Sequence, residues 1–384
     1  MLMYFDTEYY FKMLRRLWRE RHWKPAKRIR LLLKLLFGVP LLYLVHATFF
    51  LLDYLVFPRL WTQRIESPVF IVGHARSGTT LMHRLMAADG ERFSFFLYWE
   101  MFFPSLLQKK LIRGFGILDR KLFGRFFRRR LEAWDEKVFG PGRKMHHIGL
   151  WVPEEDNFVM TFAFASGYWT LQAPYMDELD IFYADRLPEK KRRRWLNYYR
   201  ECVRRQLYLN GGDKIHLSKN PIFCGWTASL AETFPGARFV VLIRHPFECI
   251  PSLLKLMERN WRGRGWPEES YRESLEVLAQ MSFDAYRMPR QFLERCPHVP
   301  HAVVDYRELV AEPKATVEAV YQQIGLDVSP ALEKILDEQQ SRSRQHVAKH
   351  EYTMAEYDLK EDTIRRELTG FFDEFNWDVE TSHG

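Results

Sequence analysis

The sequence predicts an α/β protein with a parallel β-sheet flanked by helices. Three candidate strands are apolar or partly apolar runs, at 68–73, 238–243 and 301–305. Each is followed by a segment of helical character, at 79–88, 246–258 and 313–324. The first two strands are continuous apolar runs with β-branched residues, which fit a sheet covered on both faces. The repeated strand–helix order favours parallel strands joined by helical crossovers.

The first 64 residues differ in character from the α/β domain that we expect over 65–384. Eight Arg and Lys side chains lie between Arg15 and Arg30, and the apolar segment 31–57 follows them. That segment is long enough to cross a bilayer, which needs about 20 residues. Three polar residues that share no helical stripe interrupt it, Lys34, His46 and Asp53, and Gly38 and Pro40 divide it. We expect two shorter helices that meet near Pro40 and lie in the membrane interface; the alternative is a buried helical hairpin packed on the α/β domain.

The charge pattern predicts on which side of the membrane the protein lies. A positive N-terminus favours the cytosolic side and anionic lipid headgroups, and no signal-peptide pattern is present. No two of the four cysteines form a CxxC pair, and no Asn-X-Ser/Thr acceptor occurs. We therefore expect a monotopic protein on the cytoplasmic face; a single-pass protein with its α/β domain across the membrane is the alternative. The oligomeric state, a homodimer included, stays open.

The net charge of +8 suits an anionic ligand, a nucleic acid or an anionic membrane. The sequence has no zinc-finger spacing, helix-turn-helix signal or RNA-motif aromatic pair. We therefore expect no nucleic-acid partner. The basic runs 128–130 and 190–194 are interpreted as solvated or lipid-facing helix surface.

The stretch PVFIVGHARSGTTLMHRL, residues 68–85, has the pattern of a phosphate-binding loop. Gly73 and Gly78 allow a tight turn between a strand and a helix. Backbone N–H groups of such a turn, at a helix N-terminus, bind anions. The side chains that add donors to this anion site are those of Arg76, Ser77, Thr79 and Thr80.

Two departures limit what this loop binds. Thr79 occupies the position where a nucleotide triphosphatase keeps its lysine, and strand 238–243 ends in Arg244 rather than in a magnesium-binding Asp. Both indicate a group less charged than a triphosphate, with no required metal. A sulfate ester linked to one phosphate meets that description. A P-loop kinase or other phosphotransferase is the first alternative.

Two motifs carry a family resemblance. IVGHARSGTT resembles the 5′-phosphosulfate loop of sulfotransferases that use 3′-phosphoadenosine 5′-phosphosulfate (PAPS), with Ala75 in place of a Pro. RHPFECIPS, which contains Arg244 and Ser252, resembles their 3′-phosphate motif. The resemblance spans about residues 65–370 and is greatest to a bacterial, membrane-linked branch. It implies a P-loop NTPase-like sulfotransferase fold, with PAPS as donor and 3′-phosphoadenosine 5′-phosphate as product.

Three further segments are similar to parts of the same family. LSKNP contains Lys219 and resembles a short lysine motif; VVDYREL at 303–309 resembles a segment whose tyrosine, here Tyr306, contacts the nucleotide. HVAKHEYTMAEYDL at 346–359 resembles a C-terminal loop that closes over the nucleotide, and it supplies Lys349 and Tyr352 as further nucleotide contacts.

The resemblance implies in-line transfer of a sulfuryl group to an acceptor hydroxyl or amine, driven by positioning and electrostatics. Arg76 is expected to stabilise charge on the leaving side and Lys219 to contact the transferring group. The alternative for Lys219 is a surface lysine before an Asn-Pro turn. A relative that keeps the fold but has lost activity is the second alternative for the whole chain.

Glu100 is the first candidate for the base that takes the acceptor proton, because it lies 24 residues after Arg76 in an apolar, aromatic setting. The alternative is a structural glutamate paired with an arginine. His147 is the rival, with its neighbour His146, since a His serves as base in the cytosolic branch. Two acidic residues that follow Pro153 either cap a helix or lie near the acceptor: Glu154 and Glu155.

The acceptor is expected to be an amphiphile. Residues 93–185 are rich in aromatic side chains and follow a lipid-seeking segment. A lipid, a glycolipid or a hydrophobic alcohol fits that setting. A glycan is the other candidate, because basic runs suit a polysaccharide.

Overall fold

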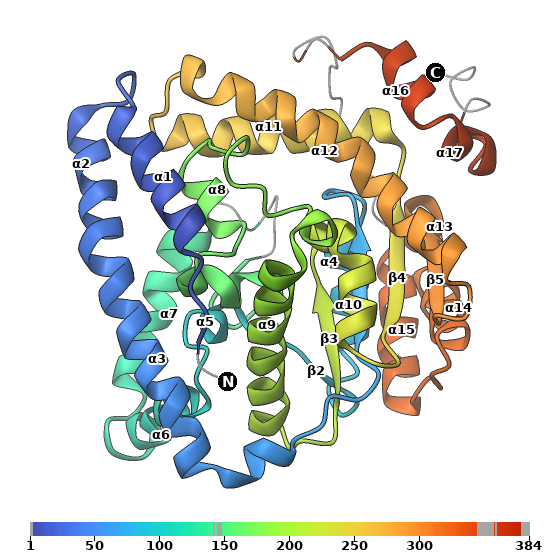
Figure 1. Cartoon of the computed structure of the whole chain (residues 1–384). Helices are drawn as coiled ribbons and strands as arrows, with labels where there is room; N and C mark the ends of the chain where they lie inside the picture. Colours follow the sequence, from blue (N-terminus) through green and yellow to red (C-terminus); the bar gives the residue numbers. More distant parts are fainter. Residues whose placement is uncertain (1–2, 141–142, 144–147, 344–356, 358, 378–384) are drawn as a thin grey trace.

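The centre of the protein is a five-stranded parallel sheet, seen in a computed structural model that describes residues 3–140, 143, 148–343, 357 and 359–377 (Figure 1). The strand order is β2-β3-β1-β4-β5. The strands are β1 (Val69–Gly73), β2 (Phe93–Ser94), β3 (Ile215–Lys219), β4 (Arg238–Ile243) and β5 (His301–Asp305). The predicted α/β class and all three predicted strands are confirmed.

Parallel pairing brings the carboxyl ends of the strands to one edge of the sheet. Gly73 at the end of β1 pairs with Leu242 of β4, and Ile71 pairs with Lys219 at the end of β3. Ile243 of β4 pairs with Asp305 of β5. Ligands of open α/β sheets bind at this edge, where the connections to the next helices begin.

Helices cover both faces of the sheet. The first face packs on α4 (Thr79–Ala87), α14 (Pro313–Gln323) and α15 (Pro330–Ser343); the second packs on α9 (Glu189–Leu209), α10 (Thr227–Thr233), α11 (Pro246–Gly263) and α12 (Glu268–Arg295). Val69 and Ile71 belong to the core cluster on the first face, and Phe70 and Val72 belong to the cluster on the second face. Successive residues of β1 therefore point to opposite faces of the sheet. The helices predicted after β1, β4 and β5 are α4, α11 and α14.

The remaining elements are short or lie outside the sheet layers. The α-helices are α5 (Tyr98–Met101), α6 (Leu106–Leu122), α7 (Phe126–Phe139), α8 (Tyr168–Gln172), α13 (Tyr306–Ala311), α16 (Glu361–Glu367) and α17 (Thr369–Glu374). The 3-10 helices are η2 (Pro58–Thr62), η4 (Asp156–Ala163), η5 (Ala184–Arg186) and η6 (Pro221–Trp226).

The N-terminal region begins with α1 (Thr7–Arg19) and continues as one helical run through α2 (Pro25–Leu33), a π-helical turn η1 (Lys34–Gly38) and α3 (Val39–Val56). The expected break near Pro40 is wrong, because Gly38 and Val39 keep right-handed helical dihedrals. Proline lacks the N–H that would bond four residues back, and a π-turn absorbs such a loss without ending the helix. Among the described residues, Pro25–Val56 is the helical run long and apolar enough to cross a membrane.

His46 and Asp53 of α3 share a face, whereas Lys34, on η1, is exposed, so the three polar residues do not share one buried face. His46 and Asp53 are seven residues, about two turns, apart, and both are buried. The Nδ1 atom of His46 lies 3.1 Å from Oε1 of Gln108, and the carboxylate of Asp53 accepts a hydrogen bond from Nε of Arg205 at 2.7 Å. Asp53 also accepts from the backbone N–H groups that begin α6.

The inner face of the N-terminal region therefore packs on the rest of the chain, and its apolar side chains join the larger core cluster. The domain boundary at residue 64 stays a prediction.

Candidate active site

The predicted phosphate loop connects β1 to α4 at the carboxyl edge of the sheet. Gly73, Arg76 and Gly78 all have positive φ angles, of 138°, 75° and 94°. A Cβ atom on Gly73 would lie 2.4 Å from the carbonyl oxygen of Leu242, so only glycine allows β4 this close. The loop thus turns tightly and presents its backbone N–H groups at the start of α4, as an anion site requires.

The loop is in direct contact with the second predicted anion motif. The Nε atom of Arg76 donates a hydrogen bond to Oγ of Ser252 at 3.2 Å, and Nη1 of Arg244 donates to the backbone carbonyl of Arg76 at 3.1 Å. Arg244 leaves the end of β4, and Ser252 lies on α11. The structure therefore brings together three residues that the sequence assigns to opposite ends of one nucleotide.

Tyr306, which follows the end of β5, packs against both the loop and Arg244. The guanidinium carbon of Arg244 lies 4.2 Å from the centre of the Tyr306 ring. A Cβ atom on Gly78 would lie 2.7 Å from that ring, so the tyrosine packs directly on the loop. Cation–π contact with Tyr306 holds the Arg244 side chain against the loop.

Several buried donors around the loop have no hydrogen-bond partner in the part of the chain that the structure describes. They include Oγ of Ser77, within the loop, and Nδ2 of Asn220, which follows β3. The backbone N–H of Asn220 bonds the carbonyl of Ile71, so β3 brings this side chain to the end of β1. Buried polar groups are normally paired, and these donors fit the phosphate oxygens of a nucleotide. Asn220 was not predicted, although its motif LSKNP was.

Lys219 is buried and paired with two carboxylates. Its Nζ atom lies 2.9 Å from Oε1 of Glu154 and 3.3 Å from Oε1 of Glu155. Burial lowers the pKa of Lys219, but the two carboxylates more than offset this and the pKa is raised, so the side chain is a cation. The alternative of a surface lysine is wrong. Glu155 occupies the N-cap position of η4, although its side chain makes no cap hydrogen bond.

His83 lies on α4, one turn after the loop, and is electrostatically coupled to Lys219. Burial, with a smaller contribution from Lys219, lowers the pKa of His83 to about 3. Neither ring nitrogen has a hydrogen-bond partner among the described residues. The imidazole is therefore neutral at physiological pH. The sequence offered one signal for it, a His five residues after Gly78 on a helix that faces the sheet.

Asp156, which follows Glu154 and Glu155, anchors β3, the strand that ends in Lys219. Asp156 accepts hydrogen bonds from Oγ of Ser218 at 3.0 Å and from the hydroxyl of Tyr199, and it lies 3.1 Å from Nε2 of His216. All four side chains are buried. The stretch 154–156 thus fixes the end of β3, and with it the position of Lys219.

The contacts of Glu100 favour the structural alternative over the expected role as a base. Oε1 accepts from Nη2 of Arg113 at 2.7 Å, while Oε2 accepts from Nε2 of Gln206 at 2.8 Å and from the backbone N–H of Leu97. Both oxygens are occupied in a helix cap and an ion pair. No contact joins Glu100 to the loop, to Lys219 or to Arg244 among the described residues. Four other predicted side chains lie outside the described residues: His146, His147, Lys349 and Tyr352.

An apolar pocket of about 200 Å³ opens beside the loop. Ala75 of the loop and Glu155 line it, and most of its wall is aliphatic, thioether and aromatic. Wall residues come from α11, α12 and the segment 167–182, among them Leu253, Met257 and Leu278. The pocket can thus hold an apolar group with one end next to the anion site.

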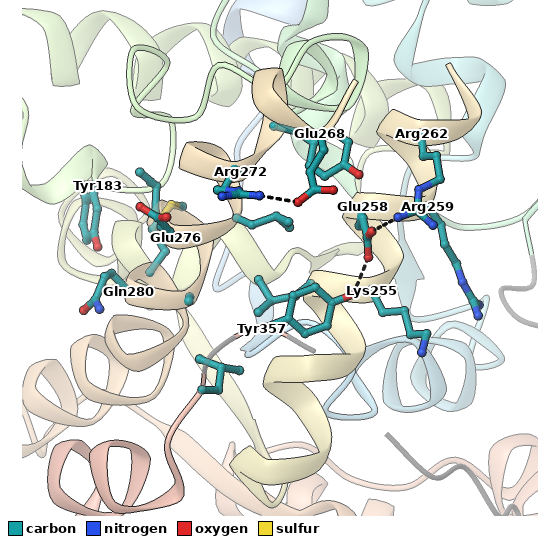
Figure 2. A pocket seen from close by; sticks show the side chains of 17 residues that line it. Tyr183, Lys255, Glu258, Arg259, Arg262, Glu268, Arg272, Glu276, Gln280 and Tyr357 are labelled. Carbon is teal, nitrogen blue, oxygen red and sulfur yellow. Dashed lines mark hydrogen bonds and ion pairs between the residues drawn. The ribbon is translucent and has the colours of Figure 1, made fainter. Parts of the chain in front are cut away.

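A larger hollow of about 1310 Å³ lies along the outer side of α11 and α12 (Figure 2). Figure 2 shows ion pairs on its wall, between Arg262 and Glu258 and between Arg272 and Glu268. The hydroxyl of Tyr357 also donates to Glu258 at 2.7 Å. No loop residue lines this hollow, although Met281 lines both hollows. We therefore take the smaller, apolar pocket as the candidate acceptor site.

No group of three or more His, Cys, Asp or Glu side chains suited to a metal ion occurs in the described part of the chain.

The fold and site together define a class: an α/β protein of the P-loop-like kind whose anion loop lacks the triphosphatase lysine and touches a second anion motif. A model of the sulfotransferase family matches residues 68–330. The chain belongs to the sulfotransferase family.

Relatives and solved structures agree with that membership. The chain is 25% identical over 277 residues to the omega-hydroxy-beta-dihydromenaquinone-9 sulfotransferase Stf3 of Mycobacterium bovis and Mycobacterium tuberculosis; the match covers 68% of this chain and 63% of that relative, less than two thirds of its length. The fold matches the crystal structure of sulfotransferase STF9 from Mycobacterium avium with a TM-score of 0.74 at 17% identity, over 97% of this chain and 93% of that one. STF1 from Mycobacterium tuberculosis gives a TM-score of 0.69 at 17% identity, over 95% and 93%.

Proposed function

We propose that this protein transfers a sulfuryl group from PAPS to a hydroxyl or amine of an amphiphilic acceptor. The observation that carries the proposal is the contact between Arg76 and Ser252, because it joins two anion motifs that one adenosine bisphosphate would bridge. Family membership supports the same reaction class.

The nucleotide would lie across the carboxyl edge of the sheet. The loop, through Ser77, Gly78, Thr79 and Thr80, would hold the 5′-phosphate end, with backbone N–H groups at the start of α4 and the Ser77 hydroxyl, which has no hydrogen-bond partner among the described residues. Arg244 and Ser252 would hold the 3′-phosphate. Arg76 lies between the two ends, and Tyr306, Lys349 and Tyr352 remain proposed nucleotide contacts.

Lys219 would supply the positive charge beside the transferring group. Its burial keeps water away from the ammonium, which strengthens its effect on nearby charge. Ion pairing with Glu154 and Glu155 orients it before the donor binds. Preorganised charge of this kind replaces the metal ion that phosphoryl transfer uses.

We propose Glu155 as the proton acceptor in place of Glu100. Glu155 lines the apolar pocket, contacts Lys219 and keeps 28% of its side chain exposed, so an acceptor hydroxyl can reach it. In the reaction, the acceptor oxygen forms a bond to sulfur while the bond from sulfur to the bridging phosphate oxygen breaks. The electron pair leaves with the phosphate, and the acceptor proton passes to the Glu155 carboxylate.

The shape of the pocket supports an amphiphilic acceptor. Its apolar wall would take a hydrocarbon or ring system, and an acceptor hydroxyl near Ala75 and Glu155 would lie beside the anion loop and Lys219. The relative Stf3 is named for a hydroxylated menaquinone, an apolar molecule with one terminal hydroxyl. For this chain we propose the same chemical type, a hydrophobic alcohol, and not a particular compound.

Transfer of labelled sulfate from PAPS onto a bacterial lipid extract tests the proposal, with Lys219→Ala as the matched variant. We expect labelled lipid with the wild-type protein and a loss of label of about 10²–10³-fold with the variant. Equal label from both proteins would show that the site does not catalyse the transfer.

A further inference from the structure

Two helical segments far apart in the sequence form one exposed apolar surface. The described part of the chain exposes 30 large apolar side chains, and 23 of them lie on the run Pro25–Val56 or within residues 106–139. The second group includes Phe115, Leu118 and Leu122 on α6, and Leu131 and Trp134 on α7. In Figure 1 these helices occupy the same side of the molecule, α2 and α3 beside α6 and α7.

The two segments are joined by buried polar contacts. Asp53 of α3 accepts from the backbone N–H groups that begin α6, and His46 contacts Gln108. These contacts fix which faces of α3 and α6 turn outward. Soluble monomers rarely expose so many large apolar side chains on one side.

Positive charge borders this surface. Arg120, Lys121, Arg129 and Arg130 of the α6–α7 segment form no ion pair with a carboxylate among the described residues, and Arg130 lies 4.8 Å from the Phe126 ring centre. Apolar side chains bordered by Arg and Lys are the pattern of helices that lie in the interface of an anionic bilayer.

We propose that α2, η1, α3, α6 and α7 form a single surface that inserts into one leaflet of a membrane containing anionic phospholipid. The protein is then monotopic, with the helices lying in the plane of the interface. The α6–α7 segment extends the membrane contact beyond the N-terminal region. The proposal is independent of sulfuryl transfer.

Two observations favour this arrangement over a membrane-spanning helix and over a symmetric dimer. A spanning helix would place Asp53 in lipid and would take this partner away from the fully buried Arg205 of α9. A symmetric dimer through the same surface would bring like charges of α6 and α7 against their copies, whereas the cores of such interfaces are poor in charge.

Vesicle flotation of the full-length protein tests the surface. We expect binding to phosphatidylcholine vesicles that contain phosphatidylglycerol, and weaker binding to phosphatidylcholine alone. The Leu118→Glu/Leu122→Glu variant should lose about tenfold or more of its partition into vesicles, because charges replace two exposed leucines that would be buried in the bilayer. The matched control, Val303→Glu/Ile335→Glu, changes exposed apolar residues on β5 and α15 and should bind as the wild type does.

Equal binding of both variants would overturn the role of α6 and α7. A second outcome would assign the surface to a dimer. In that case the wild type does not bind vesicles, and sedimentation velocity shows a wild-type dimer that dissociates in the Leu118→Glu/Leu122→Glu variant. Circular dichroism of each variant distinguishes a loss of binding from a loss of fold.

Topology is tested with single cysteines at Lys24 and Arg59, beyond the two ends of the helical run, in a Cys296→Ser background. An impermeant maleimide should label both from the same side of cell membranes. Labelling from opposite sides would show a spanning helix and contradict the proposal.

Discussion

Nε of Arg76 donates a hydrogen bond to Oγ of Ser252, 3.2 Å away, although 176 residues separate them in the chain. Parallel pairing of β1 with β4 makes this contact possible, because it sets the loop after one strand beside the helix after the other. Two motifs that look independent in the sequence are therefore parts of one site.

Ser252→Ala should weaken the binding of 3′-phosphoadenosine 5′-phosphate about tenfold, because a hydrogen bond to a charged group is removed. Binding of adenosine 5′-phosphate, which lacks the 3′-phosphate, should stay within about twofold of the wild type. Titration calorimetry measures both. An equal loss for the two ligands would mean that Ser252 acts on the loop and not on a 3′-phosphate.

Glu155→Gln should lower kcat by about 10²–10⁴-fold, since the amide cannot accept the acceptor proton. Glu100→Gln should leave kcat within a few-fold but lower Tm, because it weakens the ion pair with Arg113. Steady-state kinetics and thermal unfolding of the two variants separate the roles. A large loss of kcat only in Glu100→Gln would restore Glu100 as the base.

Asp53→Ala should destabilise the protein by about 3–5 kcal/mol, because Arg205 keeps only Glu201 of its two buried carboxylate partners and the N–H groups that begin α6 lose their acceptor. Urea unfolding measures the change. Exposed Asp362→Ala, on α16, serves as the control and should change the free energy of unfolding by less than about 0.5 kcal/mol. A negligible effect of Asp53→Ala would show that the N-terminal helices contribute little to the fold.

The stability of the protein should fall as the pH drops from 7 toward 4, in part because of His83. The pKa of His83 is lowered to about 3 in the folded state, from an unfolded value near 6.5. Below pH 6.5 His83 therefore binds a proton in the unfolded chain but stays neutral in the folded chain, so the free energy of unfolding decreases as the pH falls.

Between pH 7 and pH 5 this group should account for about 2 kcal/mol of the free energy of unfolding. His74, whose pKa burial lowers to about 4, adds a similar effect. Urea unfolding measures the change in the free energy of unfolding between pH 7 and pH 5. This change should be about 2 kcal/mol smaller in His83→Met than in the wild type. An unchanged difference would place His83 in a solvated setting.

Much of the fold could be predicted because the strands β1, β4 and β5 carry a local apolar signal. β3 escaped prediction because its sequence, IHLSK, is short, has three polar residues in five and lacks the continuous apolar run of the other strands. Partners elsewhere in the chain, such as Asp156, bury its polar side chains. β2 has two residues, too few for any periodic signal. Burial of polar groups by distant partners cannot be read from a local pattern.

Some residues of the candidate site could be predicted from the sequence and others could not. Arg76, Arg244 and Ser252 could be predicted because each follows a recognisable strand. The sequence favoured Glu100 over Glu155 as the base, because the contacts that decide between them come from distant parts of the chain. Only the fold decides that Arg113 and Gln206 occupy the first, while the second lies beside Lys219.

The central claim is that one adenosine bisphosphate touches both the Arg76 loop and the Arg244–Ser252 motif. Titration calorimetry of the full-length protein with 3′-phosphoadenosine 5′-phosphate, with adenosine 5′-phosphate and with ATP plus magnesium tests it most directly. We predict that the bisphosphate binds one to one and at least about tenfold more tightly than the monophosphate, because it gains charged contacts at its second end. Tight binding of magnesium ATP, with no binding of the bisphosphate, would contradict the account.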